Sequence, residues 1–281
     1  MVSVPLLTTF RGITNREALL FEGENGWAEW SPFLEYHDDE ARTWLQAALD
    51  QGFGPKRELG EVNLNATLPA VNGSEIETLL ARFGSFDTVK IKVAESGQTI
   101  EQDLSRVAEV RRLYPEAVIR LDANGGFSVE EALALAAQVG ELDYFEQPCR
   151  TIGELAELRV KLSGAVRVAA DESVRKVDDP MAVVYAGAAD VLVLKVQPLG
   201  GVTRALELAN ECGLPVTVSS ALETAVGLQA GFALATALGG NTAHGLGTLR
   251  LFENVDVFSN QALASEDRRE WWLKRLERCF I

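Results

Sequence analysis

The sequence predicts an α/β protein in which a modified TIM-type (β/α) barrel is covered by a smaller α+β capping domain. Short apolar runs typical of buried strands alternate with amphipathic helical segments from residue 87 onward. Polar residues end successive strand-like runs at intervals of 24 or 25 residues, namely Asp122, Glu146, Asp171, Lys195, Ser219 and His244. A strand, a helix and two loops together account for a repeat of about this length. We therefore expect a parallel sheet.

Two observations favour a closed barrel over an open, doubly wound sheet. No glycine-rich dinucleotide or phosphate loop follows any predicted strand. In a closed barrel, polar groups at the ends of six or seven strands would also meet in one cavity at the carboxyl rim, where barrel active sites lie. In an open sheet, the outermost of these groups would be too far apart to act together.

Residues 1–84 lack the repeat, and we expect them to form the α+β capping domain. The predicted elements are a hairpin of residues 2–10 and 18–27 with turn residues at 24–26, a helix over 37–50, a strand over 62–68 and a helix over 74–83. The strand over 62–68 fits either the capping domain or the start of the barrel.

The barrel is predicted over residues 85–250, and its helices carry start and stop signals. The starts are Thr99 with Gln102, Ser128 with Glu131, and Asp179 before Pro180, and the stops are Gly140, Gly187 and Gly213. Residues 251–281 leave the pattern and end in a charged, tryptophan-containing, helix-like segment. We expect this tail to pack on the N-terminal part.

The composition limits the kinds of partner. The chain of 281 residues has a formal net charge of −15, which argues against nucleic acid and anionic membranes as partners. Its start lacks the pattern of a secretory signal, and no apolar run reaches about 18 residues. The three cysteines form no spaced framework, so we expect a cytoplasmic protein with reduced thiols. The sequence leaves the oligomeric state open.

Three carboxylates, those of Asp122, Glu146 and Asp171, are expected to lie on neighbouring strands. Close together they would repel one another, and a divalent cation would relieve this. Oxygen ligands without histidine or thiolate indicate Mg²⁺, with Mn²⁺ as the alternative. With two histidines in the chain, a three-histidine metal site is excluded. The competing interpretation is that each acid caps a helix or lies on the surface of a loop.

Three lysines are expected near these acids. Lys90 and Lys92 are separated by one residue, so both side chains point into the barrel, and Lys195 follows a strand on the other side. A lysine becomes a usable base only if burial and nearby positive charge lower its pKa. Lysines flanking a metal suit removal of a proton next to a carboxylate. Alternatively, they form structural ion pairs with the acids, and we expect His244 to be structural.

These motifs resemble the muconate-lactonising subgroup of the enolase superfamily over about residues 85–250. The motifs are Lys90-x-Lys92, LDANGGF with Asp122, FEQP with Glu146, ADES with Asp171, LVLKVQPLGG with Lys195, and SSALETAVG at 219–227. The resemblance implies a capping domain built from the N-terminal part and the C-terminal tail. It also implies metal ligation by the three carboxylates and acid/base roles for Lys92 and Lys195.

Within that subgroup, the short chain with FRGITNRE at 10–17 and EWSPFLEY at 29–36 resembles the actinobacterial type of o-succinylbenzoate synthases. The resemblance implies a lyase of menaquinone synthesis that acts on a small anionic carboxylate. Lys92 would be the base of a syn dehydration, Lys195 would stay charged on the opposite face, and Lys90 would support Lys92. The implied substrate contacts are Ser219, Ser220 and Asn124, with Arg120 at the margin of the site.

Three alternatives remain at this point. The first is racemisation or epimerisation of an N-acylamino acid or dipeptide, which uses the same two lysines. Dipeptide epimerases of the family carry Asp-x-Asp at the eighth strand, where this chain reads AHGLGTL. Cycloisomerisation of a muconate is the second alternative, and a catalytically idle metal-binding scaffold is the third.

Overall fold

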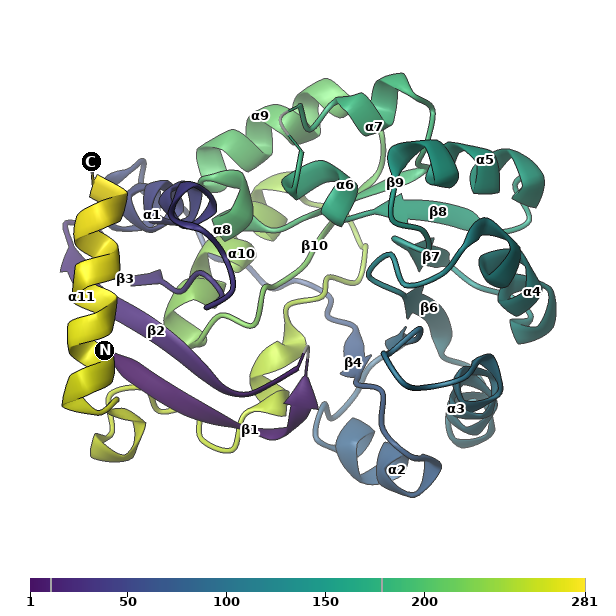
Figure 1. The fold of residues 1–281 in the computed structure, drawn as a ribbon, viewed down its shortest axis with the longest axis horizontal. Helices are drawn as coiled ribbons and strands as arrows, with labels where there is room; N and C mark the ends of the chain where they lie inside the picture. Colours follow the sequence, from purple (N-terminus) through teal and green to yellow (C-terminus); the bar gives the residue numbers. More distant parts are fainter. Residues whose placement is uncertain (11, 178, 281) are drawn as a thin grey trace.

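The computed structural model describes residues 1–10, 12–177 and 179–280. Its central feature is one curled sheet of parallel strands in the order β10-β9-β8-β7-β6-β5-β4, so that each strand lies beside the next in the chain (Figure 1). The strands are β4 (Ala66–Leu68), β5 (Thr88–Lys92), β6 (Val118–Asp122), β7 (Tyr144–Glu146), β8 (Arg167–Ala170), β9 (Val191–Leu194) and β10 (Val216–Val218).

Residues 244 and 245 join the two edges of this sheet. Leu64 forms a parallel bridge with His244, and Ser219 forms one with Gly245. The amide of Asn65 donates to the carbonyl of His244 at 2.9 Å, and the amide of Gly245 donates to the carbonyl of Val218 at 2.8 Å. The predicted closure into a barrel is confirmed.

Helices cover the outer face of the barrel, as the repeat predicts. They are α2 (Gly73–Ala81), α3 (Ile100–Leu113), α4 (Val129–Val139), α5 (Ile152–Leu162), α9 (Val202–Cys212) and α10 (Ala225–Leu238). Thr99 and Ser128 form the predicted capping boxes at the starts of α3 and α4. Strand residues such as Ile91 and Leu121 are fully buried against these helices in one continuous core.

The connection between β8 and β9 differs from the prediction. Asp179 accepts a hydrogen bond from the amide of Met181 at 2.9 Å, but the N-cap of the following helix is Met181 and not Asp179. This helix, α7 (Ala182–Tyr185), has a single turn because Gly187 takes a left-handed conformation (φ 60°) soon afterwards. Two other short helices, α6 (Glu172–Arg175) and α8 (Val196–Leu199), directly follow β8 and β9.

The capping domain contains a three-stranded antiparallel sheet of β1 (Val2–Phe10), β2 (Ile13–Gly23) and β3 (Gly26–Trp30). The predicted antiparallel pairing of residues 2–10 with the next strand is present, but the prediction of a single hairpin missed one turn and one strand. β2 begins at Ile13, opposite Phe10, because Gly12 (φ 77°) forms a first turn that the sequence pattern did not reveal. The predicted turn at 24–26 does exist, but it joins β2 to β3.

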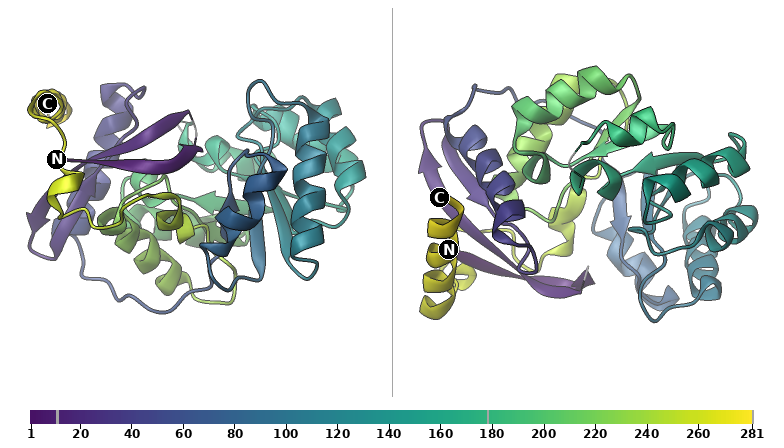
Figure 2. Two further views of the ribbon diagram at one scale, coloured as in Figure 1. Left: turned by 90° about the horizontal axis from the view of Figure 1, so that it is seen from below. Right: turned by 45° about the horizontal axis from the view of Figure 1, so that its top comes forward.

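The C-terminal tail packs on the capping domain. α11 (Glu266–Phe280) lies beside the β1–β3 sheet and α1 (Asp38–Phe53), and both chain ends lie on this side of the molecule (Figures 1 and 2). Trp272 of α11 meets Trp30 edge to face, with ring centroids 5.2 Å apart. Arg275 donates to the carbonyls of Phe33 and Tyr36 at 3.1 and 2.7 Å. Two 3₁₀ turns, η1 (Gly247–Leu251) and η2 (Asn260–Ala262), lead to this helix.

The strand predicted over residues 62–68 belongs to the barrel, since β4 pairs with β5. The division of the chain near residues 84 and 250 stays a prediction, and we propose that the barrel part begins with β4. Among the described residues, no helix is both long and apolar enough to cross a membrane. The three cysteines are buried and free.

Candidate active site

Three carboxylates lie at the carboxyl ends of three adjacent strands. Asp122 ends β6 and is paired in register with Glu146, which ends β7. Asp171 directly follows β8, whose Ala169 is in register with Glu146. Asp122 is 9% exposed, whereas Glu146 and Asp171 are fully buried. The structure thus places the three predicted ligand residues on neighbouring strands at one rim of the barrel.

Cationic side chains contact each of these acids. Lys90 Nζ lies 3.0 and 2.9 Å from the two carboxylate oxygens of Glu146 and 3.5 Å from Asp122 Oδ2. Lys195 Nζ lies 2.5 Å from Asp171 Oδ2, and Arg175 Nε lies 2.7 Å from Asp171 Oδ1. These pairs are buried, so their charges are poorly screened by water.

The two fully buried acids, Glu146 and Asp171, differ in the direction of their pKa shifts. Burial raises the pKa of Glu146 to about 7; Lys90 opposes this rise, and the charges of Asp122 and Asp171 add to it. Burial also acts on Asp171, but Arg175 and Lys195 outweigh it and hold the pKa of that carboxyl well below its usual range. Burial therefore outweighs the single lysine partner of Glu146, whereas the two cationic partners of Asp171 outweigh its burial.

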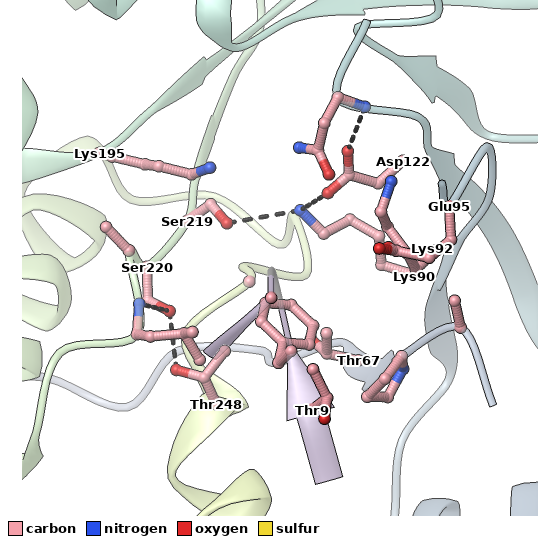
Figure 3. Close-up of a pocket in the computed structure, with 18 of the residues that line it drawn as sticks. Thr9, Thr67, Lys90, Lys92, Glu95, Asp122, Lys195, Ser219, Ser220 and Thr248 are labelled. Carbon is pink, nitrogen blue, oxygen red and sulfur yellow. Dashed lines mark hydrogen bonds and ion pairs between the residues drawn. The ribbon is translucent and has the colours of Figure 1, made fainter. Parts of the chain in front are cut away.

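A cavity of about 200 Å³ lies above these groups and is lined by Lys90, Lys92, Asp122, Asn124 and Lys195, among others. Figure 3 shows Lys195 on the opposite side of this cavity from Lys90 and Lys92. Lys92 Nζ donates to the carbonyl of Val93 at 2.7 Å. The two lysines that the sequence predicts as acid/base groups thus reach one cavity from opposite sides.

The donor atoms fit a hard divalent cation in their chemistry. They are carboxylate oxygens at the ends of adjacent strands, without thiolate or imidazole, which is the ligand type that hard divalent cations prefer. In the described part of the chain, no three Asp, Glu, His or Cys side chains are grouped closely enough to hold an ion as they stand. Lys90, Lys195 and Arg175 instead share the carboxylate oxygens.

The residues predicted to contact substrate fall into two groups. Ser219, Ser220 and Asn124 line the cavity. The hydroxyl of Ser220 is 2.7 Å from that of Thr248, an interaction drawn in Figure 3. The side-chain amide of Asn124 donates to Glu172 Oε1 at 3.3 Å. Arg120 is the one member of the second group, because it does not line the cavity.

The expected place of Arg120 at the margin of the site is wrong. Its guanidinium lies 2.7 Å from Asp143 Oδ2 and donates to the carbonyl of Ala243 at 2.5 Å. It also stacks over the ring of Tyr144, 4.6 Å from the centroid. Asp143 lies just before β7, so Arg120 points toward the amino end of the barrel, away from the cavity.

Sequence reasoning missed several groups that line the cavity. The capping domain contributes Thr8, Thr9 and Phe10, and the barrel contributes Thr67, Glu95, Thr248 and Arg175. The spacing of Arg175 four residues after Asp171 was a signal for an ion pair on one helical turn. The residues of the capping domain had no such signal, because they reach the cavity only through tertiary packing. In the segment at 10–17, position 11 lies outside the described residues.

His244 is part of the barrel wall. Its Nδ1 accepts a hydrogen bond from the amide of Val218 at 3.0 Å, and the residue is 3% exposed. Burial, with a smaller contribution from the nearby Arg120, lowers the pKa of His244 to about 4. The ring is therefore neutral near pH 7 and supports the closure of the barrel.

Acidification is expected to destabilise the barrel through His244. A folded pKa below the ordinary value of 6.5 means that protonation favours the unfolded chain, so stability is lost as the pH falls from about 6.5 toward 4. In His244→Asn, the amide oxygen can still accept from Val218 without titrating. Urea unfolding at pH 7.5 and pH 5 should show a smaller loss of stability for this variant than for the wild type. An equal loss in both proteins would contradict the role given to His244.

Comparison with known proteins agrees with this geometry. Residues 73–266 match the family model described as enolase C-terminal domain-like, and residues 1–52 match enolase N-terminal domain-like. The o-succinylbenzoate synthase of Mycobacterium ulcerans is 47% identical over all of this chain and 92% of its own length. The chain belongs to the o-succinylbenzoate synthase family of the enolase superfamily. Membership of this superfamily generally implies a divalent metal.

Another curated relative and a solved structure are also similar to this chain. The o-succinylbenzoate synthase of Mycobacterium tuberculosis is 44% identical over all of this chain and 93% of its own. Among solved structures, a dipeptide epimerase from Enterococcus faecalis superposes with a TM-score of 0.75 at 21% identity, covering 90% of each chain. At that identity the likeness shows the fold alone, which is the enolase fold with its capping domain.

Proposed function

We propose that this chain is an o-succinylbenzoate synthase, which removes water from 2-succinyl-6-hydroxy-2,4-cyclohexadiene-1-carboxylate to give 2-succinylbenzoate in cytoplasmic menaquinone synthesis. The observation that carries the proposal is the pair Lys92 and Lys195 on opposite sides of one cavity, in a chain 47% identical over its whole length to a curated synthase. Product aromatisation favours the reaction, so one well-placed base is enough to start it.

Each lysine has a separate part in this proposal. Lys92 takes the proton next to the substrate carboxylate and returns it to the departing hydroxyl on the same face. Lys195, on the other face, stays charged and stabilises the carbanionic intermediate. Lys90 also stays charged: although burial lowers its pKa, the carboxylates of Glu146 and Asp122 outweigh this effect and raise it well above its ordinary value. Lys90 is held on these carboxylates and lies two residues from Lys92 on β5.

We assign the metal of this family to Mg²⁺, with Mn²⁺ as a substitute, held by Asp122, Glu146 and Asp171. When bound, such an ion supplies positive charge that stabilises the developing negative charge on the substrate. Ser219, Ser220 and Asn124 would contact the small dicarboxylate substrate from the cavity wall.

A second candidate is racemisation of an N-acylamino acid. The opposed lysines favour it, because a two-base exchange needs one group on each face. The run AHGLGTL offers no acid to hold the amine of a dipeptide, which disfavours dipeptide epimerisation.

Metal removal tests the proposal directly. Purified protein treated with a chelator should lose turnover of the synthetic cyclohexadiene substrate, and added Mg²⁺ should restore it. In parallel, N-succinylamino acids are incubated with the protein in heavy water to detect exchange of the α-proton. Exchange without dehydration would replace the synthase assignment by the racemase. Full dehydration after chelation would contradict the metal assignment.

A further inference from the structure

A buried polar cluster joins the capping domain to the loop that follows β10. Glu29 of β3 is fully buried. Its carboxylate accepts hydrogen bonds from Ser31 Oγ at 2.6 Å, Thr224 Oγ1 at 2.5 Å, the amide of Thr224 at 3.1 Å and the amide of Gly227 at 2.9 Å. Thr224 and Gly227 stand at the start of α10. A carboxylate of one domain thus satisfies amides at the start of a helix of the other.

Close packing fixes the position of this carboxylate. A Cβ atom at Gly227 would come within 2.8 Å of Glu29 Cδ and 2.9 Å of Gln197 Nε2, so a side chain there would displace these groups. The hydroxyl of Ser31 is also 3.3 Å from Gln197 Oε1. Hydrogen bonds from several donors to one buried carboxylate are strong and specific in direction.

The side chain of Arg16, in β2, forms hydrogen bonds with the middle of the loop that follows β10. The residue is 2% exposed, and its Nε donates to the carbonyl of Leu222 at 3.0 Å. A second guanidinium nitrogen lies 3.4 Å from the carbonyl of Ala221. Leu222 has a φ of 61°, a left-handed conformation that is uncommon for leucine and persists only where the surroundings hold it.

This loop forms one wall of the cavity. Residues 219–222 all line it, whereas Glu29 and Arg16 do not. We propose that Glu29 and Arg16 are positioning residues, which hold residues 219–222 in the shape that binds the substrate. The inference deepens the proposed function and rests on it for its kinetic test. Through these contacts with residues 219–222 of the barrel, the capping domain contributes to substrate affinity.

A matched contact elsewhere serves as the control. Asp50 of α1 accepts from the amide of Val202 at 2.9 Å and from the hydroxyl of Thr203 at 2.8 Å, at the start of α9. Here too a carboxylate of the capping domain satisfies the start of a barrel helix. The groups in this second contact do not line the cavity.

Steady-state kinetics of Glu29→Gln and Asp50→Asn test the proposal. Loss of the charged acceptor at residue 29 should raise KM about tenfold or more while kcat changes less than about threefold, because both lysines stand on other strands. Asp50→Asn should keep the wild-type KM. Equal KM values in the two variants, or an equal fall of kcat and kcat/KM in Glu29→Gln, would overturn the proposal.

Hydrogen exchange of the protein without substrate separates this inference from the proposed function. Glu29→Gln should speed exchange of amides within 219–227, and Asp50→Asn should speed it near 202 and leave 219–227 protected. Unchanged exchange at 219–227 in Glu29→Gln would overturn the positioning role even if the wild type has another substrate. If Glu29→Gln fails to fold, Thr224→Val removes one hydroxyl donor and should raise KM in the same direction. Thr224→Ser should then restore it, and failure of either expectation contradicts the proposal.

Discussion

Replacing Lys92 with alanine is expected to lower kcat for dehydration by a factor of about 10²–10⁴, the usual contribution of a positioned acid/base group. Lys92 lines the cavity at the end of β5. The neighbouring Lys90 is held on Glu146 at 2.9 Å, so it is not available as a substitute base. The effect should appear in single-turnover experiments with enzyme in saturating excess over substrate, where binding and product release do not mask the chemical step.

The matched control is Lys161→Ala. Lys161 lies at the exposed end of α5, where it pairs with Glu157 at 2.8 Å, and it does not line the cavity. Its replacement should leave kcat unchanged. If Lys92→Ala retains wild-type turnover while Lys195→Ala loses it, the proton is taken from the opposite face and the assignment of the two lysines must be reversed.

Replacing Trp272 with alanine is expected to cost about 3–5 kcal/mol of unfolding free energy, the range for removal of a large buried aromatic side chain. Trp272 is fully buried, packs edge to face on Trp30 and donates from its indole nitrogen to Glu17 at 2.8 Å. These contacts tie α11 to the sheet of the capping domain. Urea unfolding followed by circular dichroism would measure the loss.

Trp271→Ala is a close control because the two residues are neighbours of the same type on one helix. Trp271 is 36% exposed and stacks with Arg268, whose guanidinium carbon is 4.6 Å from the ring centroid. Its removal should cost about 1 kcal/mol. Equal losses in the two variants would show that α11 is not held by the buried face that contains Trp272.

Local patterns in the sequence were sufficient to predict the barrel and the rim that carries the site. Alternation along a strand decides which face a side chain takes, so Lys90 and Lys92 had to point inward together. The constant interval between strand ends then placed Asp122, Glu146 and Asp171 on neighbouring strands. Both inferences depend on residues close together in the chain, where backbone geometry is the controlling factor.

Tertiary structure decided toward which end of the barrel each inward-facing side chain extends. Lys90 and Arg120 are in register on adjacent strands, and both face inward. Lys90 reaches Glu146 at the carboxyl end, whereas Arg120 reaches Asp143 at the amino end. The alternation of side chains along a strand decides which face of the sheet a residue occupies. A long side chain on that face can still extend toward either end of the barrel, and the position of its charged partner decides which end it reaches.

The contribution of the capping domain likewise depends on tertiary structure. Nothing in the spacing around Glu29 indicates that its carboxylate meets Thr224 and Gly227, almost 200 positions later in the chain (195 and 198 residues). Such contacts form only when two separately patterned parts pack together, since their free energy comes from burying groups that are remote in sequence. By itself, the sequence determined the barrel, its polar strand ends and the inward lysines. The tertiary structure decided which of these groups share the cavity and which residues of the capping domain hold its wall.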